Sequence, residues 1–447
     1  MRRLIPFLLP FLLAAGEPKD LLKATGGTGA FETLKALTTE IGPRLAGSPA
    51  DQKAHAWAAA RLRALGLEVR TEEVPLGRTW VRGAAKASLG GTPLRLAQHA
   101  WTPATPGTVV APLVLLPAQK AFSLQGQDLK GRIILGGEPD QHLDPPMMVP
   151  PLRLGPPAPE PHGFPMGQAL PALVQAGAAA LLLDAGKSDD ALNMDGTPAI
   201  ARNAELPIAF VAHRDYVRLT EAAATGAPLS LELGGTFGPA GRTYNTYADL
   251  KGSERPDEFV LLGAHLDSWD LGTGATDNGA GVAAVMEAAR LLVAQGARPR
   301  RTLRFILFGG EEQGYLGSAA YAKAHKDQLP KVSAVFVMDT GGGAVDGVAL
   351  QGRTAVVPVL TPLLEPLQAL GVVDSDLRQE NGTDHIPFHN AGVPAFCLEQ
   401  RQHTYARDHH AETDTLDKVR PEEVQQCALV MAWLGWRVAD LPGMLPR

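Results

Sequence analysis

Four continuous apolar runs in the second half of this 447-residue chain most constrain how it can fold. The runs alternate with segments of helical periodicity, and they are Phe259–Leu262, Leu303–Phe308, Ala334–Met338 and Val393–Leu398. A strand that is apolar at every position is buried on both faces, which is typical of a parallel sheet between two layers of helices. The sequence therefore predicts an α/β fold over residues 239–447, with a mainly parallel or mixed sheet sandwiched by helices.

Helix signals surround these strands. Ser48 followed by Pro49 predicts a helix that starts there and ends at Gly66. A second helix is expected between Asn278 and Gly296, and a closing helix at Glu422–Val438. Residues 17–104 are therefore expected to form the N-terminal part of the same domain.

The middle of the chain, residues 105–238, has the pattern of a separate small α/β module. Short apolar strands are expected at 131–135, 179–183, 206–211 and 229–233. Ten prolines between Pro139 and Pro165 exclude a helix or a central strand there. They predict a long loop that serves as a lid or an interface, with plain disorder as the alternative.

The N-terminus and the composition limit the setting in which the chain works. A basic start, an apolar stretch at 4–15 and small residues at 14–16 predict a signal peptide at 1–16 and a secreted, periplasmic or extracellular protein. No later stretch is expected to cross a membrane. The net charge of −6 favours neither nucleic acid nor an anionic membrane as partner. Cys397 and Cys427 are expected to be two buried thiols, with a disulfide as the less favoured alternative.

Side chains that bind metals follow the end of each of the four strands. They are His265, Asp267 and Asp277 after the first, Glu311 and Glu312 after the second, Asp339 after the third, and His409 and His410 after the fourth. Ligands of open α/β sheets bind outside the carboxyl ends of the strands, so these side chains are expected to lie together. One histidine or aspartate at a strand end is more often a cap or a core residue, whereas four strands in series indicate a metal site.

The ligand set predicts the kind of metal. Two histidines and three carboxylates without sulfur suit zinc and, less specifically, cobalt or manganese. Five side chains exceed what one catalytic zinc needs, so we expect two ions that share a carboxylate. Asp277 is the expected bridge, because glycines on both sides let the backbone approach closely. The adjacent Glu311 and Glu312 then divide two roles, with one binding metal and the other moving a proton.

These motifs resemble the co-catalytic zinc aminopeptidases of the M28 metallopeptidase family. The likeness rests on His265-Leu266-Asp267, Asp277-Asn278-Gly279-Ala280-Gly281, Gly310-Glu311-Glu312-Gln313-Gly314, Met338-Asp339, and His410 four residues before Asp414-Thr415. Within the family, the sequence is most similar to the plasma glutamate carboxypeptidase (carboxypeptidase Q) branch, through residues 265–270, Gly382-Thr383-Asp384 and the C-terminal residues 444–447. The module at 105–238 is similar to the protease-associated domain, which implies a lid inserted into a catalytic peptidase domain made of 17–104 and 239–447.

The resemblance implies a role for each position. One metal would be held by His265, Asp277 and Asp339, and the other by Asp277, Glu312 and His410. Glu311 would be the general base. Asp267 would hydrogen-bond the far nitrogen of His265 and fix its tautomer. His409 is the less favoured alternative to His410.

Residues that would contact the substrate are less constrained. Tyr405 is a candidate donor to a developing oxyanion, or else a packed aromatic. Asp384, within the matching tripeptide, is a candidate substrate contact. Arg401 and Arg407 could meet a substrate carboxylate, although solvated loop charges are favoured for both. His385 is expected to be an ordinary surface or supporting residue.

The expected function is that of a secreted exopeptidase with two zinc ions, which cleaves dipeptides or short peptides with Glu311 as base. The sequence leaves open whether it is an aminopeptidase, a dipeptidase or a carboxypeptidase, and the family likeness alone suggests a homodimer. A glutaminyl cyclase-type acyltransferase is one alternative, because the segment Asp384–Phe388 is reminiscent of that group. A receptor-like ectodomain without activity is the other alternative, and the complete ligand set argues against it.

Overall fold

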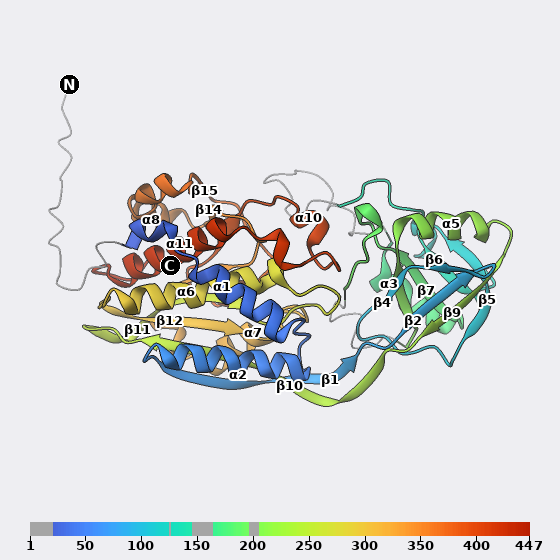
Figure 1. The fold of residues 1–447 in the computed structure, drawn as a ribbon, viewed down its shortest axis with the longest axis horizontal. Helices are drawn as coiled ribbons and strands as arrows, with labels where there is room; N and C mark the ends of the chain where they lie inside the picture. Colours follow the sequence, from blue (N-terminus) through green and yellow to red (C-terminus); the bar gives the residue numbers. More distant parts are fainter. Residues whose placement is uncertain (1–20, 125–126, 145–163, 196–204) are drawn as a thin grey trace, which may run out of the picture.

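The computed structural model describes residues 21–124, 127–144, 164–195 and 205–447. The predicted signal peptide and most of the proline-rich stretch lie outside these residues. The molecule is elongated, with a larger body that contains both ends of the described chain and a smaller unit at the far end (Figure 1). Each part is built on its own sheet of eight strands.

The body sheet has the strand order β1-β10-β12-β11-β13-β16-β14-β15. Its central strands β12, β11, β13 and β16 are parallel, whereas β1 and β10 pair antiparallel at one side and β14 runs antiparallel to β16 at the other. The strands are β1 (Glu68–Val81), β10 (Thr236–Leu250), β11 (Arg255–His265), β12 (Arg301–Phe308), β13 (Val332–Met338), β14 (Val345–Ala349), β15 (Asp374–Asp376) and β16 (Ala395–Gln400).

Helices cover both faces of this sheet. They are α1 (Gly29–Ala36), α2 (Pro49–Ala64), α6 (Ala280–Ala294), α7 (Leu316–Ala324), α8 (Val357–Leu364), α9 (Ile386–Asn390), α10 (Tyr405–Asp408) and α11 (Pro421–Ala439). Leu303, Phe305 and Leu307 of β12 join one core with α1, α2, α6 and α11. Ile306 and Phe308, which alternate with them, join a second core with α7 and α9. The strand is mainly apolar on both faces because it packs on both sides, as the sequence predicts, with Arg304 as the exception inside the run.

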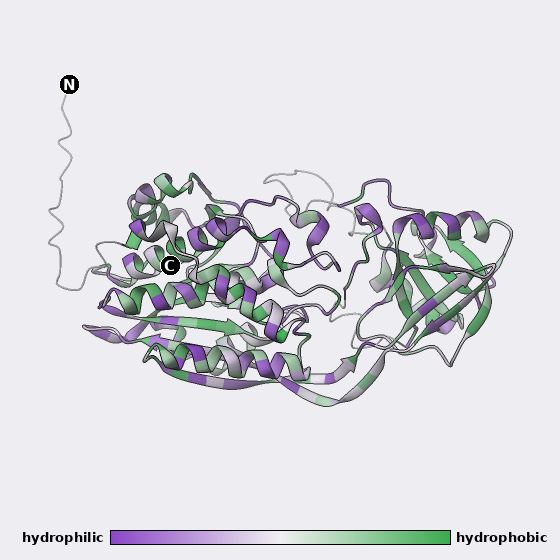
Figure 2. Cartoon of the chain, viewed as in Figure 1, coloured by the Kyte–Doolittle hydropathy of each residue, from purple (hydrophilic) through white to green (hydrophobic). Residues whose placement is uncertain are grey.

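The smaller unit repeats this arrangement in a second sheet of order β3-β2-β9-β5-β6-β7-β8-β4. The strands are β2 (Ala85–Leu89), β3 (Thr92–Leu94), β4 (Leu96–Gln98), β5 (Val109–Leu116), β6 (Ile133–Gly136), β7 (Ala180–Asp184), β8 (Ile208–Val211) and β9 (Pro228–Leu233). One face packs on α3 (Met166–Gln175) and the other on α5 (His213–Ala223). Strand β12 of the body and the central strands of the smaller sheet are mainly hydrophobic (Figure 2).

The long antiparallel pair of β1 and β10 runs from the body toward the smaller unit, which is inserted between these two strands (Figure 1). Its sheet extends from Ala85 to Leu233, and its first strands therefore precede residue 105, where the sequence places the start of the module. The difference lies in three short strands at the sheet edges, because β2 pairs with β9 and β4 pairs with β8. Strands of three to five residues among polar residues carry little periodicity to detect.

Two further expectations concern single features of the fold. Cys397 and Cys427 are both buried and free, which agrees with the expected pair of thiols and not with a disulfide. Within the described residues, no helix combines the length and the apolarity needed to cross a membrane.

Candidate active site

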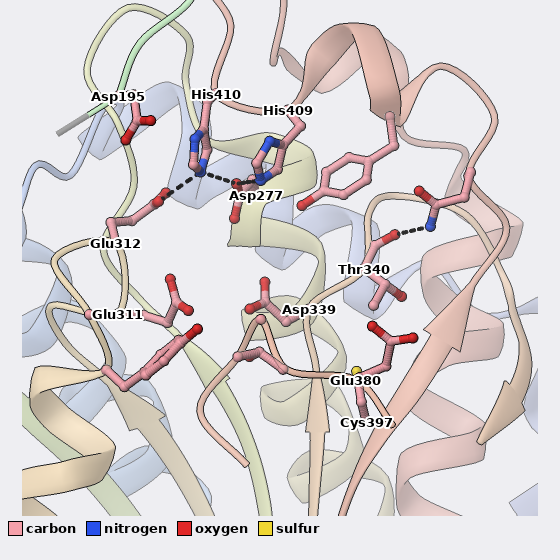
Figure 3. A pocket seen from close by; sticks show the side chains of 16 residues that line it. Asp195, Asp277, Glu311, Glu312, Asp339, Thr340, Glu380, Cys397, His409 and His410 are labelled. Atoms are coloured by element: carbon pink, nitrogen blue, oxygen red, sulfur yellow. Dashed lines mark hydrogen bonds and ion pairs between the residues drawn. The ribbon is translucent and has the colours of Figure 1, made fainter. Parts of the chain in front are cut away.

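The carboxyl ends of neighbouring strands bring the predicted ligands to one edge of the body sheet. His265 is the last residue of β11, while Glu311 and Glu312 follow β12 and Asp339 follows β13. His410 lies in the loop after β16. A cavity of about 340 Å³ at this edge is lined by the glutamate pair, Asp339 and His410, together with residues of the surrounding loops (Figure 3).

His265 lies at the centre of the acidic cluster. Its Nε2 atom is 3.0 Å from Oδ1 of Asp277 and 3.0 Å from Oδ1 of Asp339. Its Nδ1 atom lies 3.1 Å from the backbone carbonyl oxygen of Asp267, which can accept a hydrogen bond from an Nδ1–H group. The other ring nitrogen, Nε2, then faces the two carboxylates. Burial opposes a charge on the ring, but the carboxylates, led by that of Asp339, raise the pKa of His265 well above its usual value.

The structure corrects the expected contact of Asp267. Its carboxylate oxygen lies 3.6 Å from Nδ1 of His265, which is too far for a hydrogen bond, and the backbone carbonyl holds the ring instead. The two carboxylate oxygens accept the backbone N–H groups of Glu311 at 3.2 Å and Glu312 at 3.4 Å. Asp267 therefore supports both the histidine and the backbone of the glutamate pair.

Asp277 is held in a tightly packed loop before α6. The carboxylate of Asp414 accepts the N–H groups of residues 275–277 at 2.6–3.1 Å. A Cβ on Gly281 would lie 2.6 Å from the carbonyl oxygen of Met338, so glycine allows the close approach that the sequence predicts. Although burial opposes ionisation, the hydrogen bond with His265 and the nearby histidines hold the pKa of Asp277 below its usual value.

The adjacent glutamates face different partners. Oε2 of Glu312 lies 3.0 Å from Nε2 of His410 (Figure 3). By contrast, a carboxylate oxygen of Glu311 lies within 4.8 Å of ligand atoms of His265 and Asp339. Burial raises the pKa of both glutamates well above the usual value. A carboxylate with a raised pKa accepts protons more readily at neutral pH. The geometry is consistent with separate roles for the two residues.

Both His409 and His410 face Asp277. Each Nε2 atom lies 3.5 Å from Oδ2 of Asp277, and the two rings stack with centroids 3.6 Å apart. Of the two, His410 also contacts Glu312, which favours it as the ligand. His409 is the alternative, as in the sequence interpretation.

The donor atoms of this cluster fit divalent metal ions. Three overlapping groups have ligand atoms within 4.8 Å of one another: His265 with Asp277 and Glu312, His265 with Glu311 and Asp339, and Asp277 with His409 and His410. Oε1 of Glu312 is buried and has no hydrogen-bond partner among the described residues. An unpaired buried carboxylate oxygen is costly, and a metal would satisfy it.

The predicted substrate residues divide into three cases. Tyr405 is buried and lines the cavity, and burial raises the pKa of its phenol well above the usual value, so the hydroxyl keeps its proton. Asp384 is fully buried and lies outside the cavity lining, and burial raises its pKa to about 8. Neither Arg401 nor Arg407 lines the cavity. Arg401 is exposed, and Arg407 pairs with Asp408.

Four residues of the site were missed by sequence reasoning. Asp195 of the inserted unit and Glu380 line the cavity, and Asp414 holds the loop of Asp277. Arg44 is fully buried and donates to the carbonyls of Leu266, Thr273 and Gly274 at 2.7–2.8 Å. Arg44 and Asp414 act mainly on residues far away in sequence, so no local pattern marks them; only the spacing from His410 to Asp414 gave a hint.

Comparison with known sequences identifies the family. The pattern of Peptidase family M28 matches residues 245–434. Carboxypeptidase Q of Mus musculus is 30% identical over 434 residues, which cover 93% of this chain and 87% of the relative. The chain belongs to peptidase family M28.

Solved structures agree with this M28 assignment. A peptidase M28 precursor of Shewanella amazonensis SB2B has a TM-score of 0.83 at 30% identity, covering 96% of this chain and 97% of its own. The zinc aminopeptidase BSAP of Bacillus subtilis has a TM-score of 0.68 at 22% identity, covering 91% and 93%, which is a likeness of fold. The predicted α/β fold and family resemblance are confirmed, and this M28 member is a peptidase.

Proposed function

We propose that this M28 peptidase is an exopeptidase with two zinc ions that hydrolyses dipeptides or short peptides. The observation that carries the proposal is the cluster of five potential ligands, four of which line one small cavity while the fifth, His265, lies against them, together with the unpaired Oε1 of Glu312. His265, Asp277 and Asp339 would hold one ion, and Asp277, Glu312 and His410 the other. Zinc is favoured over cobalt or manganese because the set combines imidazoles with carboxylates and because BSAP is a zinc aminopeptidase.

Glu311 is the proposed general base. When bound, two zinc ions supply Lewis-acid activation of water and of the scissile carbonyl. The carboxylate of Glu311 accepts a proton from the attacking water and passes it to the leaving amine. Tyr405, with its protonated hydroxyl in the cavity wall, is placed to donate to the developing oxyanion.

The base assignment is tested by Glu311→Gln. Because Gln keeps the shape but cannot accept the proton, we expect turnover to fall about 10²- to 10⁴-fold. Zinc content, measured by elemental analysis, should stay at two per chain. Activity near that of the unaltered chain would contradict the role as base, and loss of one zinc would show that Glu311 is itself a ligand.

The cavity lining favours recognition of a peptide amino terminus. Its charged lining consists of the proposed base, the carboxylates of Asp277, Glu312 and Asp339, and two further acids, Asp195 and Glu380, whereas no lysine or arginine lines it among the described residues (Figure 3). Carboxylates attract an ammonium group and repel a carboxylate. Aminopeptidase or dipeptidase action is therefore favoured over carboxypeptidase action.

A panel of blocked dipeptides tests this polarity. We expect N-acetylation of a good substrate to lower kcat/KM at least about 100-fold, because it removes the ammonium group that the acidic lining attracts, and C-terminal amidation to lower it less than about tenfold. The reverse order would contradict recognition through the amino end. Cyclisation of an N-terminal glutamine peptide in place of hydrolysis would favour the glutaminyl cyclase alternative, which no feature of the site supports.

Three further parts of the proposal concern the setting of the enzyme. The basic and apolar start of the chain supports a signal peptide at 1–16 and a secreted or extracytoplasmic enzyme. The inserted unit is proposed to be a protease-associated domain, and the extent of its sheet supports a start near residue 85. A homodimer is proposed from the family likeness alone.

A further inference from the structure

A segment of the inserted unit, residues 187–195, pairs with the loop that carries His410. The N–H of Met194 donates to the carbonyl of His410 at 2.6 Å, and the N–H of Glu412 donates to the carbonyl of Leu192 at 3.0 Å. These bonds flank an antiparallel bridge between Asn193 and Ala411. The loop that carries His410 is therefore hydrogen-bonded to an extended segment of the inserted unit.

His410 needs such support because its backbone is strained. Its φ is +52°, in the left-handed region that residues other than glycine rarely adopt. Such a conformation persists only where the surrounding structure imposes it. The bond from Met194 acts directly on the carbonyl of this residue.

Two side chains strengthen the same contact. Lys187 is buried, and its Nζ donates to the carbonyls of Ala406 at 2.8 Å and His409 at 2.9 Å. Oε1 of Glu412 accepts the N–H of Leu192 at 2.9 Å. Burying an ammonium group costs free energy unless its N–H groups are hydrogen-bonded. The two bonds from Lys187 therefore indicate that this side chain holds the loop in place.

The ring of His410 is also fixed from the side. Trp269 meets it edge-on with centroids 5.7 Å apart, and Trp101 packs against Trp269 at 6.2 Å. Trp101 follows β4 of the inserted sheet. The contacts from Trp101 to Trp269 and from Trp269 to His410 therefore also connect the inserted unit to the proposed metal-binding histidine. Backbone and ring of His410 are thus both held by contacts that start in the insertion.

We propose that residues 187–195 form a brace that positions His410 and thereby sets the affinity of the metal position that His410 shares with Asp277 and Glu312. The inference rests on the proposed two-zinc site. The other position, formed by His265, Asp277 and Asp339, belongs wholly to the body and does not depend on the brace. Because coupling is reciprocal, metal at the His410 position also strengthens the docking of the inserted unit.

The test is zinc titration of the metal-free full-length protein by calorimetry, with Lys187→Met as the main variant. We expect two zinc ions in the unaltered chain, and in the variant one affinity weakened about 10- to 100-fold with the other unchanged. Lys187→Arg should restore much of the loss, since it keeps the charge and the donors. Lys86→Met, at an exposed lysine of β2, is the matched control and should change neither affinity.

A second variant and a second measurement distinguish loss of the brace from misfolding of Lys187→Met. Glu412→Leu removes the acceptor on the other side of the bridge and should weaken the same single affinity. In hydrogen exchange, zinc should slow the amides of Met194 and Glu412 in the unaltered chain but not in Lys187→Met. One zinc in the unaltered chain would overturn the two-metal site; two zinc ions bound equally tightly by Lys187→Met would overturn the brace alone.

Discussion

His385 is a buried histidine next to Asp384 whose titration links pH to stability. Burial lowers its pKa to about 4, and the amide nitrogen of Gln351 lies 2.6 Å from its Nε2. In the unfolded chain its pKa is about 6.5, so between pH 6.5 and 4 the unfolded state binds a proton that the folded state does not. The free energy of unfolding therefore falls as the pH falls through this window. Above pH 6.5 the ring is neutral in both states, so its titration does not change the free energy of unfolding.

Replacing His385 should flatten this dependence. With metal removed from all samples, we expect the loss of unfolding free energy between pH 7 and pH 4.5 to be about 2.5 kcal/mol smaller in His385→Gln than in the unaltered chain. Urea unfolding at the two pH values measures it. His142→Gln, at an exposed histidine, should leave the dependence unchanged. An equal loss in His385→Gln would mean that the ring is protonated in the folded protein.

The roles of single residues differ in how well they can be predicted from the sequence. The candidate metal cluster could be predicted because its members lie at the carboxyl ends of strands marked by apolar runs, or in the loops that follow these strands. Arg44 could not be predicted, because its partners are backbone carbonyls more than 200 residues away, and any carbonyl looks alike in a sequence. Asp267 was placed beside the right histidine but given the wrong contact, since only coordinates separate 3.6 Å from a hydrogen bond.

Helix α2 shows a capping pattern that the sequence fully reveals. The Oγ of Ser48 accepts the N–H of Asp51 at 3.1 Å, and the carboxylate of Asp51 accepts the N–H of Gly47 at 2.9 Å. Pro49 occupies the first helical position, where its missing N–H costs nothing. The helix packs through Ala54, Ala58 and Leu62 on the core of the body.

Removing the cap should destabilise the body without touching the site. We expect Ser48→Ala to lower the free energy of unfolding by about 1 kcal/mol, because a helix N–H loses its acceptor. Urea unfolding measures the change, with Ser123→Ala, an exposed serine outside the helices, as the control. Ser48→Asp should retain the stability. If Ser48→Ala is as stable as the unaltered chain, water replaces the hydroxyl as acceptor.

Other elements were predicted only in part, for local reasons. Helix α8 begins at Val357 and contains Pro362, although a proline favours the first turn of a helix and so marks a later start. The long strand β10 was missed, because its first part, with two glycines and a proline, lies away from the core and carries no apolar alternation. The helix at 278–296 was found because α6 is buried along nearly its whole length.

The two units of the molecule meet at the candidate metal site. Asp195 of the inserted unit lines the cavity, and residues 192–194 pair with the loop of His410. The sequence marks each unit through its own strands, but it has no signal for a contact between a loop of one and a loop of the other. The cluster itself places Asp277, Glu311, Glu312 and Asp339 in a largely buried space, where their charges repel one another unless cations are present.

Removing metal should therefore weaken the whole enzyme. Zinc that binds the folded state alone adds about 4 kcal/mol at a concentration of 1,000 times its Kd, so a chelator should lower the Tm by several degrees and abolish hydrolysis. Zinc should restore both. Calorimetric scans with and without chelator measure the shift. Asp277→Ala, which lacks the shared ligand, should bind little zinc and show no chelator shift; a shift equal to that of the unaltered chain would mean that the stabilising metal lies elsewhere.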